Sequence, residues 1–242
     1  MEKLQPLKIL DYQTQSKTLS RFIVELGKRR QPVEILEAGC GRQWPLNLDG
    51  TLYTLTGVDL DPHGLDARKN IKGDLHKAVI GDLRDIDLPS GRYDVIYSAY
   101  VLEHVEGAEK VLDNFVRWLT KDGIIVLMIP DRDTVWGFVA RTTPYWFHVA
   151  FKRYVQRNAN AGKPGFGPFP TVHDKIVSRR GIYEYCRRNS LQVKHEHAHV
   201  FQPKRLGSVI KGATKLIGWL SLGRLEWRYC DVILVLERQP VR

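Results

Sequence analysis

Two short segments near the start of the chain constrain its fold more than any other part. Residues 33–41, VEILEAGCG, form an apolar run that ends in a small-residue turn, and residues 55–62, LTGVDLDP, contain a second run that ends in an acid. In an open α/β sheet, glycines after the first strand let backbone approach a ligand, and an acid after the second accepts hydrogen bonds from ribose hydroxyls. The pair therefore predicts a parallel α/β sheet with a nucleotide-type cofactor site.

The glycine pattern argues against a dinucleotide. Gly39 and Gly41 are present without a third glycine, and residues 45–50, PLNLDG, give a weak helix signal. A pyrophosphate needs a helix N-terminus at this place, so a cofactor without a phosphate fits the segment better.

These residues resemble the class I S-adenosylmethionine-dependent methyltransferases. The first motif of that family typically reads acid, x, Gly, x, Gly, which Glu37, Gly39 and Gly41 match, and Asp59 matches its ribose carboxylate. The resemblance continues through GDLRDIDLPSGRYDVIYSAYVLEHV (81–105) and KDGIIVLMIPD (121–131). It covers roughly residues 33–130, with four elements in the family's order.

The resemblance implies S-adenosyl-L-methionine as methyl donor and S-adenosyl-L-homocysteine as product. It also implies a set of cofactor-binding residues: Glu37, Gly39 and Gly41 on the methionine and ribose side, Asp59 with Leu60 at the ribose, Asp82 and Leu83 at the adenine, and Ser98 at the methionine end.

Strands alternate with helices along the chain. The expected strands are 33–38, 52–59, 78–82, 93–98, 123–129, 191–200 and 230–237, and the expected helices are 16–30, 108–123 (ended by Lys121-Asp122-Gly123) and 178–190. This pattern predicts a Rossmann-like, mostly parallel seven-stranded sheet with helices on both faces, whose last strand runs antiparallel. We expect a single domain over 1–242, with a cofactor core at 33–130, an aromatic insertion at 131–177 after the fifth strand and an amphipathic insertion at 202–227 before the last strand.

Composition bears on the size of the core and on the cellular compartment. Of 242 residues, 43% are hydrophobic, which suffices for one sizeable core. Three widely spaced cysteines, the lack of a signal-peptide pattern and the lack of a long apolar run favour a cytoplasmic protein.

Positive charge is concentrated in the second half. Residues 1–130 carry 17 Lys and Arg against 19 Asp and Glu, a net charge of −2, whereas 131–242 carry 20 against 8, a net charge of +12. This surplus favours a role toward the substrate or a surface over a role at the cofactor. A solvated basic face and an RNA or tRNA substrate are the alternatives.

Both insertions allow two interpretations. The aromatic insertion follows the fifth strand, so it forms either a lid or wall of the substrate pocket or an extra helix over the core. Within the amphipathic insertion, apolar residues recur at helical spacing with basic residues between them, so 204–222 either contacts an anionic membrane peripherally or packs on the protein's own core.

Histidines are the natural general bases for a hydroxyl acceptor near neutral pH. Candidates are His104 after the fourth strand, His148 in the aromatic insertion and His173 before the helix at 178–190, and we favour His104 and His173. His195, His197 and His199 alternate along one strand face, an arrangement that resembles a metal site but more often is solvated.

The segment LEHV at 102–105 resembles a metal-binding ExxEH of ubiquinone O-methyltransferases and small-RNA 2′-O-methyltransferases. Glu103 and His104 match that pattern, but Tyr100 replaces its first acid. With one hard ligand lost, we predict no metal site. His104 as a core histidine remains the alternative to a functional role.

Together these features predict a methyltransferase that acts on a hydroxyl of a bulky apolar small molecule or a lipid-linked acceptor. An RNA or tRNA methyltransferase and a non-catalytic S-adenosylmethionine-binding module remain alternatives. The sequence leaves the acceptor atom and the oligomeric state open.

Overall fold

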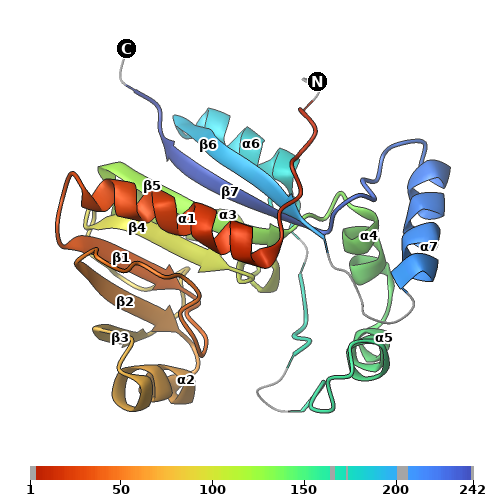
Figure 1. Ribbon diagram of the computed structural model, residues 1–242, viewed down its shortest axis with the longest axis horizontal. Coiled ribbons are helices and arrows are strands. Elements are labelled where there is room, and N and C mark those ends of the chain that lie inside the picture. The colour runs from red at the N-terminus through yellow and green to blue at the C-terminus, as the bar shows by residue number, and fades with distance from the viewer. Residues whose placement is uncertain (1–3, 164–166, 173, 201–206, 241–242) are drawn as a thin grey trace.

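A seven-stranded sheet runs through the centre of the protein, in the strand order β3-β2-β1-β4-β5-β7-β6 (Figure 1). The computed structural model describes residues 4–163, 167–172, 174–200 and 207–240. The strands are β1 (Val33–Ala38), β2 (Tyr53–Asp59), β3 (Lys77–Ile80), β4 (Tyr93–Ala99), β5 (Leu119–Pro130), β6 (Leu191–His199) and β7 (Asp231–Arg238).

The first five strands pair in parallel, whereas β7 runs antiparallel to both β5 and β6. The predicted Rossmann-like sheet with a reversed last strand is therefore confirmed. Because parallel strands all end at one edge, the segments that follow β1, β2 and β4 meet there. That edge faces the helices after β5 in Figure 1.

Helices cover both faces of the sheet. On one face lies α1 (Tyr12–Gly27), and on the other lie α3 (Ala108–Trp118) and α6 (Arg179–Arg188) (Figure 1). Leu19 and Ile23 of α1 pack on one apolar cluster, and α3 and α6 contribute to the other. The short α2 (Pro62–Asp66) continues into the π-helical η1 (Ala67–Lys72) after β2.

Helix α1 spans Tyr12–Gly27 against the predicted 16–30, and the end of α3 also differs from the prediction. Helix α1 begins earlier, because the Asp11 side chain caps it by accepting a hydrogen bond from the Thr14 amide. Helix α3 ends at Trp118 and not at the predicted Lys121-Asp122-Gly123, because Leu119 turns to extended backbone and pairs with Tyr93. Burial of Leu119 in the sheet therefore outweighs the stop signal that follows it.

The aromatic insertion folds into α4 (Val135–Thr142), α5 (Tyr145–Ala150) and η3 (Phe151–Val155), and a short 3-10 turn, η2 (Leu102–His104), follows β4. The amphipathic insertion forms α7 (Gly207–Leu220), which packs beside α4 (Figure 1). No helix among the described residues is both long and apolar enough to cross a membrane.

Candidate active site

The turn after β1 requires glycine at its first position. Gly39 has a φ of +72°, and a Cβ added to it would lie 2.3 Å from a methyl carbon of Val101, which follows β4. Gly41 also has a positive φ, +53°, but a Cβ there would meet open space. The turn thus packs against the end of β4 on one side and leaves room for a ligand on the other.

Asp59 ties this turn to the end of β2. Its Oδ2 accepts a hydrogen bond of 2.8 Å from the Gly41 amide, and its Oδ1 accepts one of 2.9 Å from the Asp61 amide. These bonds fix the carboxylate at the strand edge while leaving further lone pairs on both oxygens. Leu60 beside it is exposed.

Glu37 is buried and forms an ion pair. Nη1 of Arg68 lies 2.7 Å from its Oε2 and also donates a 2.7 Å hydrogen bond to the Cys40 carbonyl. Burial raises the pKa of Glu37, and the guanidinium of Arg68 opposes that shift. Through Arg68, Glu37 is therefore linked to the backbone of the glycine turn.

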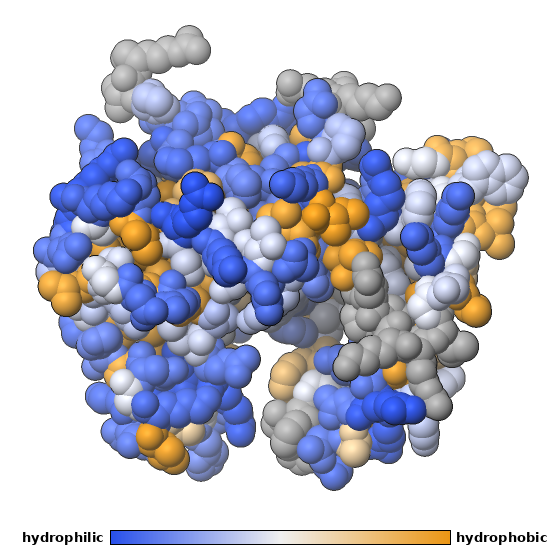
Figure 2. All heavy atoms as spheres, in the orientation of Figure 1, coloured by the Kyte–Doolittle hydropathy of each residue, from blue (hydrophilic) through white to orange (hydrophobic). Residues whose placement is uncertain are grey.

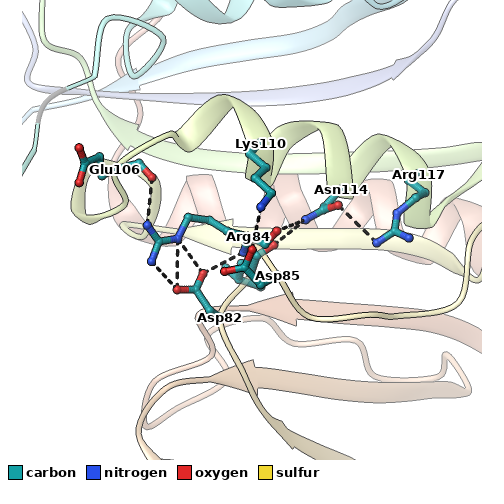
Figure 3. A network of polar contacts seen from close by, with 8 residues as sticks. Asp82, Arg84, Asp85, Glu106, Lys110, Asn114 and Arg117 are labelled. Atoms are coloured by element: carbon teal, nitrogen blue, oxygen red, sulfur yellow. Dashed lines mark hydrogen bonds and ion pairs between the residues drawn. The ribbon is translucent and has the colours of Figure 1, made fainter.

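Asp82 begins the polar network of Figure 3. Arg84 donates from Nε and Nη2 to its carboxylate, with Nη2 at 2.6 Å, and also donates its backbone amide. These hydrogen bonds from Arg84, the largest cause, lower the pKa of Asp82. Leu83 is buried, and its carbonyl accepts a hydrogen bond from Asn114 of α3. This network fixes the segment that follows β3.

The end of β4 carries a buried polar atom and a strained residue. Ser98 is buried, and its Oγ has no hydrogen-bond partner within the described part of the chain. Tyr100 has a φ of +58°, a rare value for a tyrosine, and its hydroxyl donates a 3.1 Å hydrogen bond to Asp231. Strain of this kind concentrates at functional sites.

A cavity of about 810 Å³ lies beside this edge of the sheet. The aromatic insertion supplies much of its wall, and its lining includes Tyr100, Glu103, His104, Trp136, Arg141, His148, Phe151, Lys152, Phe169 and Asp231. Figure 2 shows the surface hollowed between the two lower lobes of the molecule. Helix α5 buries none of its side chains, and its Tyr145 and His148 line the cavity.

His104 lines the cavity with one ring nitrogen engaged. Its Nδ1 lies 2.7 Å from the carbonyl oxygen of Pro170, which can only accept, so Nδ1 carries the proton and Nε2 bears the lone pair. The Phe169 ring packs edge-on at 6.0 Å, and burial lowers the pKa of the imidazole. His104 is therefore neutral near pH 7 and can accept a proton at Nε2.

Glu103 lies behind His104, with Oε1 3.8 Å from its Nε2. The carboxyl group is only 3% exposed, and its Oε2 has no hydrogen-bond partner within the described ranges. Burial raises its pKa to about 8. Glu103 is therefore largely protonated at neutral pH.

The structure describes one of the other two candidate bases. His148 lines the cavity, and its Nε2 lies 3.1 Å from the Thr143 hydroxyl. His173 lies outside the described residues. The structure thus brings His104 and His148 to one cavity.

The strand histidines are not solvated as predicted. His197 is 1% exposed, and its Nδ1 lies 3.2 Å from Nε2 of His195, which packs on Phe22 of α1. The prediction failed because α1 covers this strand face. Burial lowers the pKa of His197 to about 4.

One group of potential metal ligands occurs at the end of β6. Side-chain atoms of His199, Cys230 and Asp231 lie within 4.8 Å of one another. Internal hydrogen bonds account for the arrangement, since Oδ2 of Asp231 accepts from Tyr100 and lies 3.3 Å from His199, and Cys230 donates to the His199 carbonyl.

Several site residues have no motif in the sequence. Arg68 lies in the segment ARKNIK (67–72) and is fully buried. Lys152 and Arg141 lie among aromatic residues in the sequence. They line one cavity because the insertion folds over the edge of the sheet. The sequence feature that pointed to Lys152 and Arg141 was the excess of basic residues after Pro130.

A comparison with protein-family models gives one match of immediate relevance. A model described as a methyltransferase domain matches residues 11–213. A comparison of the sequence with curated proteins gives no match.

Solved structures share the fold at low sequence identity. YcgJ from Bacillus subtilis is 14% identical with a TM-score of 0.56, over 93% of this chain and 100% of that one. An S-adenosylmethionine-dependent methyltransferase from Mesorhizobium loti is 16% identical with a TM-score of 0.55, over 85% and 91%. One from Archaeoglobus fulgidus is 15% identical with a TM-score of 0.55, over 94% and 95%.

Proposed function

This chain belongs to the class I S-adenosylmethionine-dependent methyltransferases, and we propose that it methylates a hydroxyl of a bulky apolar small molecule or a lipid-linked acceptor. The cofactor is S-adenosyl-L-methionine. The observation that carries the acceptor proposal is the aromatic-walled cavity of about 810 Å³ that His104 lines, with its Nδ1 engaged by the Pro170 carbonyl.

The residues at the strand edge fit the cofactor. Asp59 is fixed with lone pairs to spare for the ribose hydroxyls, Gly41 leaves open space, and the buried Ser98 hydroxyl lacks a partner among described residues. We propose Glu37 and Gly39 as the supports of this site and Asp82, Leu60 and Leu83 as its adenine and ribose borders. When bound, the cofactor supplies an electrophilic methyl group on a sulfonium.

The protein's part in methyl transfer is mainly to position the acceptor. A hydroxyl must lie in line with the methyl group in a site that excludes water, and its proton must leave as the new bond forms. Nε2 of His104 is the proposed proton acceptor, because Pro170 fixes the tautomer and burial keeps the ring neutral. His173 stays a second proposal for this role.

The cavity wall favours an acceptor with a large apolar part. Trp136, Phe151 and Phe169 contribute ring faces or edges to it. Rings of this kind bury large apolar area on a ligand. A volume of about 810 Å³ matches a ligand well beyond the size of a simple sugar or amino acid.

Helix α7 supports peripheral contact with a membrane. Only Thr214 and Gly218 of this helix are buried, whereas its large apolar side chains Val209, Leu216, Trp219 and Leu220 are exposed, as is Leu222 after it. The orange surface at the right of Figure 2 belongs to this region. Lys211 and Lys215 lie on the same helix, and basic residues attract anionic lipids. We propose that α7 lies on an anionic bilayer from which a lipid-linked acceptor is drawn.

Calorimetric titration with S-adenosylhomocysteine tests the cofactor site, and Asp59→Asn is expected to weaken binding at least tenfold by replacing an anionic acceptor. A mass-spectrometric screen of lipid, small-molecule and RNA extracts, each incubated with enzyme and labelled methyl donor, tests the acceptor. Label confined to water-soluble RNA would refute the apolar-acceptor proposal.

A further inference from the structure

The acceptor cavity contains more positive charge than an apolar acceptor needs. Arg132, Arg141 and Lys152 all line it, and all three are partly buried. A cation that loses solvent is costly unless a partner compensates for the lost solvation. Their contacts therefore indicate what the cavity is built to hold.

Lys152 is the clearest case. No hydrogen bond or ion pair joins its ammonium to any residue in the described ranges, and burial lowers its pKa. The ammonium reaches the opposite wall, since a Cβ built on Gly167 would lie 3.0 Å from Nζ. Its charge also contributes, after burial, to the lowered pKa of His104. Lys152 thus extends across the cavity near the proposed base.

Arg141 adds a second donor group. Its Nη1 donates to the carbonyl of Arg132, and its guanidinium stacks over the Phe138 ring with 5.5 Å between Cζ and the ring centroid. Burial, and then the charge of Arg132, lower the pKa of Arg141. The two arginines are held close together although their charges repel.

Two carboxyl groups, Glu103 and Asp231, line the cavity beside these three cations. Glu103 is largely protonated at neutral pH because burial raises its pKa to about 8. Oδ2 of Asp231 accepts from the Tyr100 hydroxyl at 3.1 Å and lies 3.3 Å from the His199 ring. The cavity therefore keeps a net positive charge within aromatic walls.

We propose that the acceptor carries a phosphate or diphosphate group, bound by Lys152 with Arg141 and Arg132, while its apolar part packs on the aromatic walls. Lysine binds phosphate as a point charge, and arginine adds directional donors. Three cations favour an oxyanion of more than one negative charge over a single carboxylate. The inference rests on the proposed function, because it specifies the acceptor of the same cavity.

Calorimetry on the full chain, saturated with S-adenosylhomocysteine, tests the proposal with three probes: farnesyl diphosphate, farnesol and inorganic diphosphate. We expect farnesyl diphosphate to bind at least tenfold more tightly than farnesol. Lys152→Gln should weaken farnesyl diphosphate about tenfold and leave farnesol within twofold, and Lys152→Arg should retain most of the affinity.

Lys163→Gln is the matched control, because Lys163 lies in the same insertion but contacts Asn160 outside the cavity lining. Equal binding of farnesyl diphosphate and farnesol, no binding of farnesyl diphosphate, or equal losses in the Lys152 and Lys163 variants would overturn the proposal. Loss of S-adenosylhomocysteine binding by the native chain would instead count against the cofactor site, so the two failures are distinguishable. If inorganic diphosphate binds tightly and Lys152→Gln leaves its affinity unchanged, the anion binds elsewhere. That outcome would also overturn the proposal.

Discussion

Arg68 and Glu37 form a buried ion pair, with 2.7 Å between Nη1 of the guanidinium and Oε2 of the carboxylate. Nε of Arg68 also donates a 3.0 Å hydrogen bond to Asp74, and Nη1 reaches the Cys40 carbonyl. One side chain therefore joins the end of β1, the glycine turn and the segment after η1. We therefore expect the acid of the first motif to act in this chain through the shape of the turn.

Removal of the cation should be strongly destabilising. In Arg68→Met the buried Glu37 carboxyl group loses its cation, and Asp74 and the Cys40 carbonyl lose a donor, which together cost about 3–5 kcal/mol of unfolding free energy. Urea unfolding followed by circular dichroism measures the loss. The double variant Glu37→Gln/Arg68→Met should recover part of it, because the buried charge is then gone. Additive losses in the two single variants would show that the residues do not act as a pair.

Gly39→Ala should damage the cofactor turn. The added Cβ would lie 2.3 Å from a Val101 methyl carbon on a backbone with a φ of +72°. Clash and strain together should cost about 3 kcal/mol of stability and lower affinity for S-adenosylhomocysteine at least tenfold. Calorimetry and urea unfolding measure both effects.

Gly91→Ala separates the two causes. Gly91 has a φ of +60°, but a Cβ there meets no atom within 4 Å, so only about 1 kcal/mol of backbone strain applies. Val101→Ala should restore part of the cofactor affinity of Gly39→Ala. If it restores none, contact with Val101 is not what demands glycine at this position.

Local pattern was sufficient for the sheet and for the turn that follows β1. Alternating strands and helices predicted seven strands with a reversed last one, and the motif pair placed Gly41 and Asp59 where one amide–carboxylate bond joins them. Such features depend on short-range periodicity and on turn chemistry, which a sequence displays directly.

Contacts between distant segments were not predictable in the same way. Arg68 lies in a charged segment and Lys152 lies among aromatic residues, and only the fold determines that one is fully buried and the other lines a cavity. The strand histidines were misjudged for the same reason, since nothing local indicates that Phe22 of α1 packs on His195. Tertiary packing thus decides which polar residues are buried and which line a cavity.

Glu103 should make stability fall as pH rises. Its folded-state pKa, raised to about 8, exceeds the ordinary value of 4.5 for a glutamate, so the folded chain binds more protons between these values. The contribution is complete below about pH 4.5 and is lost by about pH 8, with a slope of at most about 1.4 kcal/mol per pH unit. Glu103→Gln should remove this slope in urea unfolding at pH 5.5, 7 and 8.5. The exposed Glu184→Gln is the control, and an unchanged slope in Glu103→Gln would contradict the assignment.

His104 should set the acid limb of turnover. The base must be neutral, and burial lowers its pKa below the usual 6.5, so activity should be lost as pH falls, with a midpoint below 6.5. His104→Gln should reduce kcat by about 10²–10⁴ and abolish that limb, while affinity for S-adenosylhomocysteine stays within about twofold. A variant with native kcat and pH profile would transfer the role to His173 or remove the need for a base.

Helix α7 should bind anionic vesicles through both its apolar and its basic residues. Trp219 is 73% exposed and Leu222 is 87% exposed, so Trp219→Ala with Leu222→Ala removes apolar area available to a bilayer and should weaken binding at least tenfold. Lys211→Gln with Lys215→Gln should weaken vesicle binding about 30-fold, at about 1 kcal/mol per cation. Added salt should also weaken vesicle binding. Co-sedimentation with phosphatidylserine vesicles measures each loss, and Ile71→Ala, which removes a 79% exposed side chain from η1, is the matched control. If native protein ignores these vesicles, or if the Ile71 variant loses as much as the α7 variants, α7 is not a membrane-binding surface and the lipid route to the cavity fails with it.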